Sequence, residues 1–420
     1  MAEMLGVDVD PRSGKSSFVD GIPGSRCGGS ELPLSDRVTV EIIDDLQELE
    51  SREAEWSDLS ENASEPNVFY EPWMLLPALR AFGVGRGISC ALVYRESSRR
   101  DAAPHLCGLV PLERRRVSSQ VPVSAVSAWT HDYCFQSTPL LRHGHEAACL
   151  EALFRELSRG RAAPSLIEFP YLLGEGVMES AVDDVLASHQ AAFFEVSRHG
   201  RALLDARGDW QDSVARALSN RHRSELRRQR RRLAEKGDVT LRIISDAAHC
   251  GFWVDQFLEL EASGWKGRSA TAIKQDPAHA RFFKEMIQGA AAQNKLMLLG
   301  LFLNNEPIAL KCNLVSGGGA FAFKIAYDES LEKLSPGMHL EIENIRVACE
   351  HPEIEWVDSC AAPRHPMINR LWRGRRAMRH LVVSTGRWSG DAAVGLWPVV
   401  RTLRRRTRRG ARPFSIPATD

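Results

Sequence analysis

The chain has 420 residues, and its 54 Lys and Arg residues balance its 54 Asp and Glu residues, so the formal net charge is zero. This length allows two ordinary domains with terminal extensions, and a content of 44% hydrophobic and 26% charged residues is typical of a globular protein. A zero net charge gives no global argument for a nucleic-acid partner. No apolar run approaches the roughly 20 residues of a membrane span.

The nine cysteines are scattered and never occur in C-x-x-C spacing. This pattern argues against a zinc site and for a reducing compartment, although it does not exclude a single disulfide bond. The amino terminus has no basic segment followed by an apolar core, which is the pattern of a signal peptide. We therefore expect a cytoplasmic protein that uses no metal.

The chain divides into four segments. Residues 1–36 are rich in Gly, Ser, Pro and Asp and are expected to form a disordered leader. Residues 37–205 are predicted to form a first domain, in the order strand, two helices and two strands, followed by alternating helices and strands. Its irregular segment at 122–141 either lines a pocket or caps the domain edge. Residues 206–387 repeat this order, and residues 388–420 form a basic tail.

The second domain is organised around a predicted three-stranded antiparallel meander. Its apolar runs cover residues 295–303, 307–315 and 320–329. Asn304-Asn305 separates the first two runs, and a Ser-Gly-Gly-Gly turn at 316–319 separates the second and third. The last strand is predicted to lead into a helix that begins near Met338.

Two lysines of this meander are candidate anion-binding residues. If the Gly-rich turn closes symmetrically, Val315 lies opposite Ala320, Asn313 opposite Ala322 and Lys311 opposite Lys324. Like charges directly opposite each other are unfavourable, and an anionic ligand between them would resolve the conflict. Alternatively, both lysines extend to solvent.

Two other stretches could bind ligands. A long helix is predicted over residues 210–236, and its part at 219–236 carries eight Arg or Lys residues against two Glu. It could clamp phosphate or RNA, or it could be a solvated helix face. Trp265 and Lys266, in a Ser-Gly-Trp-Lys-Gly exit from a helix, could form a ligand wall, or they could be a buried Trp beside a surface Lys.

The order and spacing of these motifs resemble those of a known family. Two successive units of strand, helices, meander, helix and strand match a duplicated GNAT architecture. Trp-Lys-Gly at 265–267, Lys-Ile-Ala-Tyr-Asp-Glu at 324–329 and Ser-Pro-Gly at 335–337 resemble acetyltransferases of cellulose and exopolysaccharide biosynthesis (CelD-like), which are relatives of Fem-type peptidoglycan aminoacyltransferases. The later Asp358, Trp372 and Arg373 belong to the same resemblance, which covers residues 38–385.

The resemblance implies an α/β fold with two mixed sheets flanked by helices, and acetyl-CoA or another acyl-CoA as cosubstrate. It places the CoA pyrophosphate beside Ser335, Pro336 and Gly337, and it turns Lys324 and Asp328 towards the acceptor. The chain departs from the family pattern in two places. The phosphate turn keeps only Ser-Pro-Gly where GNAT proteins have several glycines. After Asp358 the chain reads Ala-Ala-Pro-Arg-His-Pro, where relatives often have a glycine and a Tyr-Lys pair.

Direct acyl transfer to an amine requires a deprotonated amine, a polarised thioester carbonyl and close positioning of the two. Asp328 is the first candidate for a base or acceptor-orienting group, and Asp358 is the second; the alternative role of each is capping or turn formation. Lys311 and Lys324, with Trp265 and Lys266, are the candidate substrate-binding residues.

Three functions fit this sequence. The first is an acyl-CoA-dependent N- or O-acyltransferase acting on a small-molecule or saccharide acceptor, such as a sugar, amino sugar or amino-acid-like metabolite, in polysaccharide biosynthesis. The second is a Fem-like transferase that takes its acyl group from aminoacyl-tRNA, although an RNA partner is not our expectation. The third is a non-catalytic scaffold for a polysaccharide synthase. The basic tail could touch anionic lipid at the inner face of the membrane.

Overall fold

The computed structural model describes residues 37–96, 103–116, 123–244 and 247–398. The predicted leader lies outside these residues, as does the predicted tail beyond residue 398. The start of that tail, residues 388–398, is helical. Among the described residues, no helix combines the length and the apolar character that a membrane crossing requires.

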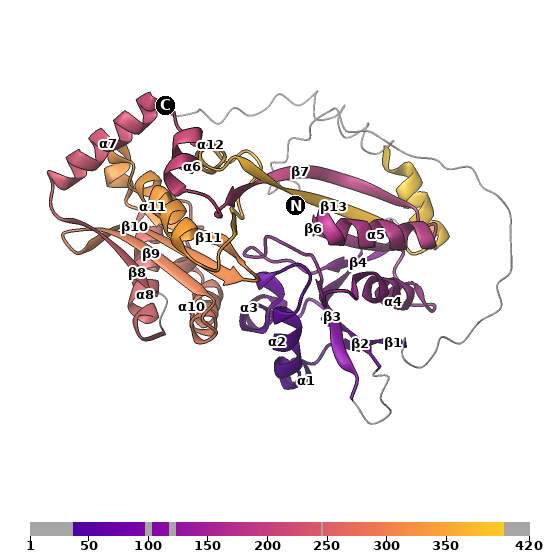
Figure 1. The fold of residues 1–420 in the computed structure, drawn as a ribbon. Helices are drawn as coiled ribbons and strands as arrows, with labels where there is room; N and C mark the ends of the chain where they lie inside the picture. Colours follow the sequence, from indigo (N-terminus) through magenta and orange to yellow (C-terminus); the bar gives the residue numbers. More distant parts are fainter. Residues whose placement is uncertain (1–36, 97–102, 117–122, 245–246, 399–420) are drawn as a thin grey trace.

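The described strands form one 13-stranded mixed sheet in the order β1-β2-β3-β4-β6-β13-β7-β12-β11-β10-β9-β8, with β5 beside β3 (Figure 1). The predicted α/β class is confirmed, and the two predicted sheets are joined edge to edge. The strands are β1 (Val38–Ile43), β2 (Ile88–Arg95), β3 (His105–Arg116), β4 (Ser124–Ala128), β5 (Leu140–Leu141), β6 (Leu166–Leu173), β7 (Phe193–Asp205), β8 (Val239–Ile244), β9 (Leu296–Leu303), β10 (Glu306–Ser316), β11 (Gly319–Tyr327), β12 (Trp356–Asp358) and β13 (Gly374–Ser384).

Helices cover both faces of this sheet. In the second half, α8 and α10 pack on one face of β9 to β11, and α11 packs on the other (Figure 1). The helices are α1 (Leu46–Ser51), α2 (Glu53–Glu61), α3 (Pro72–Ala78), α4 (Glu146–Ser158), α5 (Gly176–Ser188), α6 (Trp210–Ala217), α7 (Asn220–Ala234), α8 (Ala247–Ser263), α9 (Trp265–Arg268), α10 (Pro277–Ala292), α11 (Pro336–Glu350) and α12 (Pro366–Leu371), and a 3₁₀ helix, η5 (Glu329–Leu334), precedes α11.

The two halves of the chain exchange their last strands. β13, from the end of the second half, inserts between β6 and β7 of the first half. The end of β7 in turn pairs with β12 of the second half, where Leu204 lies opposite Val357. Each half therefore completes the sheet of the other, and this exchange makes the sheet continuous.

The predicted meander is confirmed as β9, β10 and β11, and the helix after it starts at Pro336. Val315 lies opposite Ala320 and Asn313 opposite Ala322, as expected from a symmetric turn. The predicted pairing of Lys311 with Lys324 is wrong. A β-bulge between Cys312 and Asn313 shifts the register, so Lys324 lies opposite Cys312 and Lys311 lies opposite Ile325. Neighbouring residues of a strand point to opposite faces, so the bulge places the two lysines on opposite faces of the sheet.

Candidate active site

The parallel strands β11 and β12 separate soon after they begin to pair. They are paired only from Gly319 to Phe321, where Phe321 lies opposite Asp358. β12 then ends, while β11 continues to Tyr327. Within the described residues, no backbone group hydrogen-bonds to the β12 side of β11 beyond Phe321. This edge offers unsatisfied backbone donors and acceptors to a ligand.

Lys324 lies on this part of β11, on the face covered by α8 and α10. Its Nζ atom is 4.7 Å from the centroid of the Tyr133 ring and 6.0 Å from that of Phe135. No carboxylate among the described residues forms an ion pair or hydrogen bond with this ammonium group. Burial, and to a smaller extent the charge of Lys266, lowers the pKa of Lys324 to about 8.

Tyr133 brings the first half of the chain into this site. It belongs to the irregular segment after β4, for which the sequence left pocket lining and edge capping open. Its hydroxyl group is hydrogen-bonded to Nδ1 of His279 on α10, at 2.7 Å, and its ring stacks on Phe282 with centroids 5.1 Å apart. The segment therefore packs against α10 and under Lys324, at the junction of the two halves.

The Trp-Lys-Gly motif at 265–267 meets the end of β11. The backbone N–H of Trp265 donates to Oε1 of Glu329 at 2.7 Å, while the Trp265 side chain is 56% exposed. Lys266 donates to the buried Glu261 at 2.5 Å. A Cβ atom on Gly267 would lie 1.7 Å from the carbonyl oxygen of Ala262, so this position requires glycine. The motif therefore places an exposed indole and an ion-paired lysine next to Glu329, just after the end of β11.

The two carboxylates proposed as catalytic groups have structural partners. Asp328 caps η5 by accepting a hydrogen bond from the Ser330 amide at 2.8 Å. Asp358 is fully buried, and it accepts from Arg201 at 2.6 Å, from Arg376 at 3.3 Å and from the Cys360 amide at 2.9 Å. Neither carboxylate hydrogen-bonds or ion-pairs with Lys324.

Lys311 is buried in a polar ladder under α11, on the opposite face from Lys324. Its Nζ atom donates to Glu341 at 2.8 Å, and Glu341 also accepts from Asn344 at 3.0 Å. Asn313 extends the ladder by donating to Asn344 at 2.7 Å. The predicted anion-holding lysine of β10 therefore already has an internal carboxylate partner.

The predicted phosphate turn lies at the start of α11. Ser335 adopts a left-handed conformation (φ 51°), and Pro336 is the first helical residue. A Cβ atom on Gly337 would lie 3.1 Å from the Tyr327 ring, so close packing explains the glycine. The amides of the next two residues bond to the Ser335 carbonyl. Of these first amides, that of Gly337 has no backbone acceptor within the described residues.

Two further side chains at this helix end, His339 and Arg230, were not predicted from the sequence as site residues. His339 is 7% exposed and its Nε2 atom has no hydrogen-bond partner within the described residues; the same holds for the buried Nη1 atom of Arg230 on α7. Burial and the nearby charge of Arg230 lower the pKa of His339 to about 4. Gln229 fixes α7 beside this turn by donating to the Lys333 carbonyl at 3.2 Å. Arg230 itself is half-buried, and a guanidinium nitrogen that is buried without an acceptor suits a phosphate oxygen.

Comparison with known proteins agrees with this geometry. Residues 220–365 match the family described as acetyltransferase (GNAT) domain. Residues 220–365 of the second half are therefore similar in sequence to GNAT acetyltransferase domains. No curated protein is significantly similar in sequence.

Several solved structures are similar to this chain. The crystal structure of FemX superposes with a TM-score of 0.51 at 10% identity, covering 79% of this chain and 95% of FemX. A conserved protein from Bacteroides thetaiotaomicron gives 0.49 at 10% identity, covering 80% and 97%. A tandem GNAT protein from the clavulanic acid biosynthesis pathway gives 0.40 at 14% identity, covering 83% and 99%. At these identities only the fold is shared, and the FemX superposition carries that conclusion.

Proposed function

We propose that this protein transfers an acyl group directly from acetyl-CoA, or from a longer acyl-CoA, to an amine or hydroxyl group of a sugar, amino sugar or amino-acid-like acceptor. The observation that carries the proposal is the edge of β11 next to Lys324. Among the residues that the structure describes, this edge is unpaired beyond Phe321 and the ammonium group of Lys324 has no carboxylate partner. An extended donor with amide groups would satisfy this edge by strand-like hydrogen bonds.

The donor's phosphate groups are proposed to bind at the start of α11. The helix N-terminus favours negative charge. The Nη1 atom of Arg230 is a buried donor that has no acceptor in the described part of the chain, and a pyrophosphate oxygen would supply that acceptor. The proposed pyrophosphate site comprises Ser335, Pro336 and Gly337, as the resemblance implied, together with Arg230.

In the transfer step, the acceptor nitrogen or oxygen attacks the thioester carbonyl carbon. A new C–N or C–O bond forms while the C–S bond breaks. CoA leaves as a thiolate, and the proton that the acceptor loses converts it into the CoA thiol. At neutral pH Lys324 is mostly charged, because its pKa is about 8, so it can stabilise the developing oxyanion or hold an anionic group of the acceptor. Asp328 and Asp358 act in this scheme as positioning residues. Trp265 and Lys266 line the acceptor side.

The donor site is tested by calorimetry with acetyl-CoA and longer acyl-CoAs. Arg230→Gln is expected to weaken binding by about 10- to 100-fold, because a charge-assisted hydrogen bond is worth roughly 1.5–3 kcal/mol. The matched control is Arg228→Gln on the same helix, because Arg228 is exposed and pairs with Glu225; its binding should stay within twofold or so of the wild type. If the wild-type protein binds no acyl-CoA, the proposal fails.

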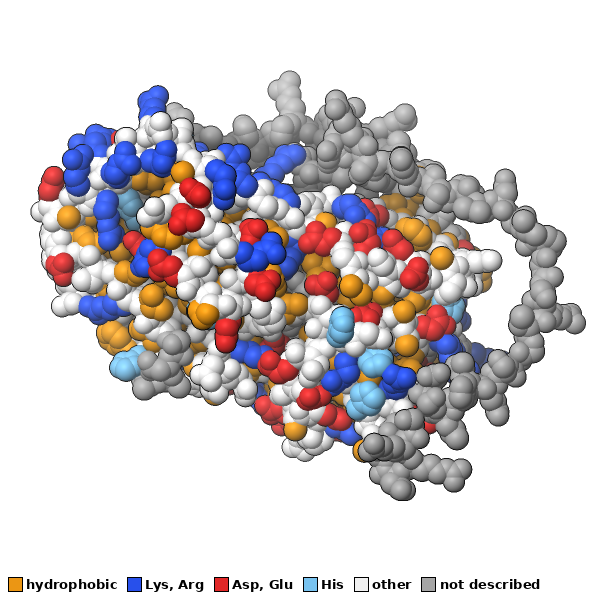
Figure 2. Space-filling model, in the orientation of Figure 1, with side chains coloured by type: hydrophobic (Ala, Val, Ile, Leu, Met, Phe, Trp, Pro, Cys, Tyr) orange, Lys and Arg blue, Asp and Glu red, His pale blue; other side chains and the backbone are white. Residues whose placement is uncertain are grey.

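A second candidate donor, aminoacyl-tRNA, is favoured by the exposed arginines of α7. Figure 2 shows Lys and Arg side chains gathered over this helix. Exchanging Arg227, Arg228 and Arg231 together for Gln should leave acyl-CoA binding intact. The same triple variant should lose transfer from aminoacyl-tRNA if RNA is the donor. Two further parts of the proposal have other support. The role in polysaccharide biosynthesis rests on the sequence resemblance, and the place at the inner face of the membrane rests on the basic sequence of residues 388–420.

A further inference from the structure

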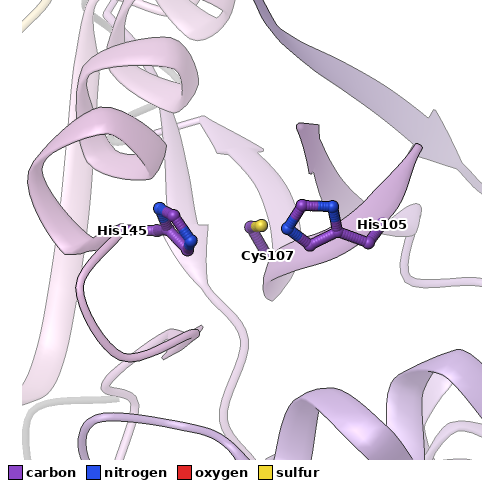
Figure 3. A group of neighbouring side chains, drawn as sticks. All are labelled: His105, Cys107 and His145. Atoms are coloured by element: carbon purple, nitrogen blue, oxygen red, sulfur yellow. The ribbon is translucent and has the colours of Figure 1, made fainter. Parts of the chain in front are cut away.

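A cluster of metal-ligand side chains lies in the first half of the chain, apart from the proposed active site. His105 and Cys107 both lie on β3, where the pairing with β2 shifts register at Cys107, and their ligand atoms are close together. β5 runs antiparallel to this part of β3. After β5 the chain turns at Gly144 (φ 78°) and reaches His145, the residue before α4. Figure 3 shows the thiol group of Cys107 between the two imidazole rings.

The donor atoms of this cluster are nearly at metal-binding distance from each other. One ligand atom from each of His105, Cys107 and His145 lies within 4.8 Å of the other two. Ligands of a tetrahedral zinc ion are about 3.3–3.8 Å apart, given Zn–N and Zn–S bonds of about 2.0–2.3 Å. Small side-chain rotations would therefore close the site. His105 is exposed, so solvent can reach a fourth position.

We propose that His105, Cys107 and His145 bind one Zn²⁺ ion, with a solvent molecule as the fourth ligand. Two imidazoles and a thiolate suit a borderline ion such as Zn²⁺, and they do not suit Mg²⁺ or Ca²⁺, which prefer oxygen ligands. The ion would tie the start of β3 to the start of α4. The sequence predicted no metal because its cysteines never occur in C-x-x-C spacing. This set has a single cysteine, and its third ligand comes from another segment of the chain.

Two arginines surround the cluster. Arg142 forms an ion pair with Asp58 and donates to the Leu106 carbonyl at 3.1 Å. Nη1 of Arg95 lies 3.2 Å from Nδ1 of His145. A guanidinium group repels a metal ion, so zinc binding must replace this contact between Arg95 and His145. We therefore expect the Arg95→Gln variant to bind Zn²⁺ more tightly than the wild type.

The test is a titration of the chelator-treated, full-length protein with Co²⁺ and with Zn²⁺. One equivalent of Co²⁺ should give a thiolate-to-cobalt charge-transfer band, and Zn²⁺ should displace it. Each of His105→Ala, Cys107→Ser and His145→Ala should weaken binding by at least about tenfold, because even the loss of an outer-shell partner costs 10- to 100-fold. His143→Ala is the matched control, since His143 lies on the same turn and its side chain is 83% exposed.

Folding defects can be separated from ligand loss. His105 is exposed, so His105→Ala should keep the metal-free melting temperature while it loses the rise in melting temperature that Zn²⁺ gives the wild type. Cobalt binding without a thiolate band would overturn the proposal, as would unchanged affinity in His105→Ala. Neither result would bear on acyl-CoA binding, because the proposed donor site lies at α11.

Discussion

The ammonium group of Lys324 costs the folded protein free energy. Its pKa falls from the ordinary value of 10.5 to about 8, mainly through burial, so the unfolded chain holds this proton more tightly than the folded chain. The cost is fully present below pH 8 and disappears as the pH rises towards 10.5. Lys324 is half-buried, and a desolvated charge with a strongly shifted pKa is typical of functional sites.

Replacing Lys324 by Met should therefore separate stability from activity. We expect Lys324→Met to stabilise the protein by on the order of 1–3 kcal/mol at pH 7, with a smaller gain at pH 10. In the proposed mechanism the Lys324 charge stabilises the transition state, so acyl transfer should fall by about 10²- to 10³-fold. Urea denaturation at both pH values and CoA release measure the two effects. Lys284→Met, at an exposed lysine paired with Asp255, is the control. A less stable Lys324→Met variant would show that the ammonium group has a stabilising partner.

The sequence predicted the place of some residues in the site and not of others. Trp265 and Lys266 stood in a recognisable motif, and the structure brings that motif to the end of β11 through Glu329. Tyr133 could not be placed, because its position depends on the packing of the two halves. Arg230 could not be distinguished from its neighbours, because an arginine-rich helix does not reveal which guanidinium group turns inward.

At the scale of elements, the bulge in β10 and β11 decides what each lysine does. Strand alternation predicted the faces correctly up to the bulge. No glycine or proline marks the bulge between Cys312 and Asn313, so the shift in register could not be foreseen. The bulge turns Lys324 towards Tyr133 and leaves Lys311 under α11, where it pairs with Glu341.

The pairing of β10 with α11 can be tested through this buried ion pair. Lys311→Met or Glu341→Leu alone should destabilise the protein by about 3–5 kcal/mol, because each leaves an uncompensated buried charge. The double variant should recover most of that loss, since two apolar side chains of similar volume fill the same space. Chemical denaturation of the four proteins completes the double-mutant cycle. Additive losses in the double variant would contradict the interpretation.

At the scale of the whole molecule, the exchange of β7 and β13 couples the two halves. Arg201 on β7 reinforces the junction by donating to Asp358 at the end of β12 at 2.6 Å and to the Phe135 carbonyl of the first half at 2.5 Å. The repeated element order was readable from the sequence. The exchange was not, because hydrophobic patterns identify strands without specifying which half each strand joins.

The exchange predicts that neither half folds alone. A fragment of residues 37–205 lacks β13, so β6 and β7 would lose their shared neighbour and expose open strand edges. We expect this fragment and the fragment 206–398 to be insoluble or unfolded when expressed separately. Co-expression should yield a complex in which a tag on one fragment retrieves the other.

Two C-terminal truncations, one before β13 and one after it, test the role of this strand in the full chain. A chain that stops after residue 373 loses β13 and should show no cooperative melting, whereas a chain that stops after residue 398 keeps every described strand and should melt like the full-length protein. Cooperative melting of the isolated fragment 37–205 would show that β13 is dispensable for the first half. If the isolated fragment does not melt cooperatively and co-expression restores the fold, the candidate site at β11 depends on the pairing of β7 with β13. The reason is that β12, the neighbour of β11, is held against β7 only while β7 is held by β13.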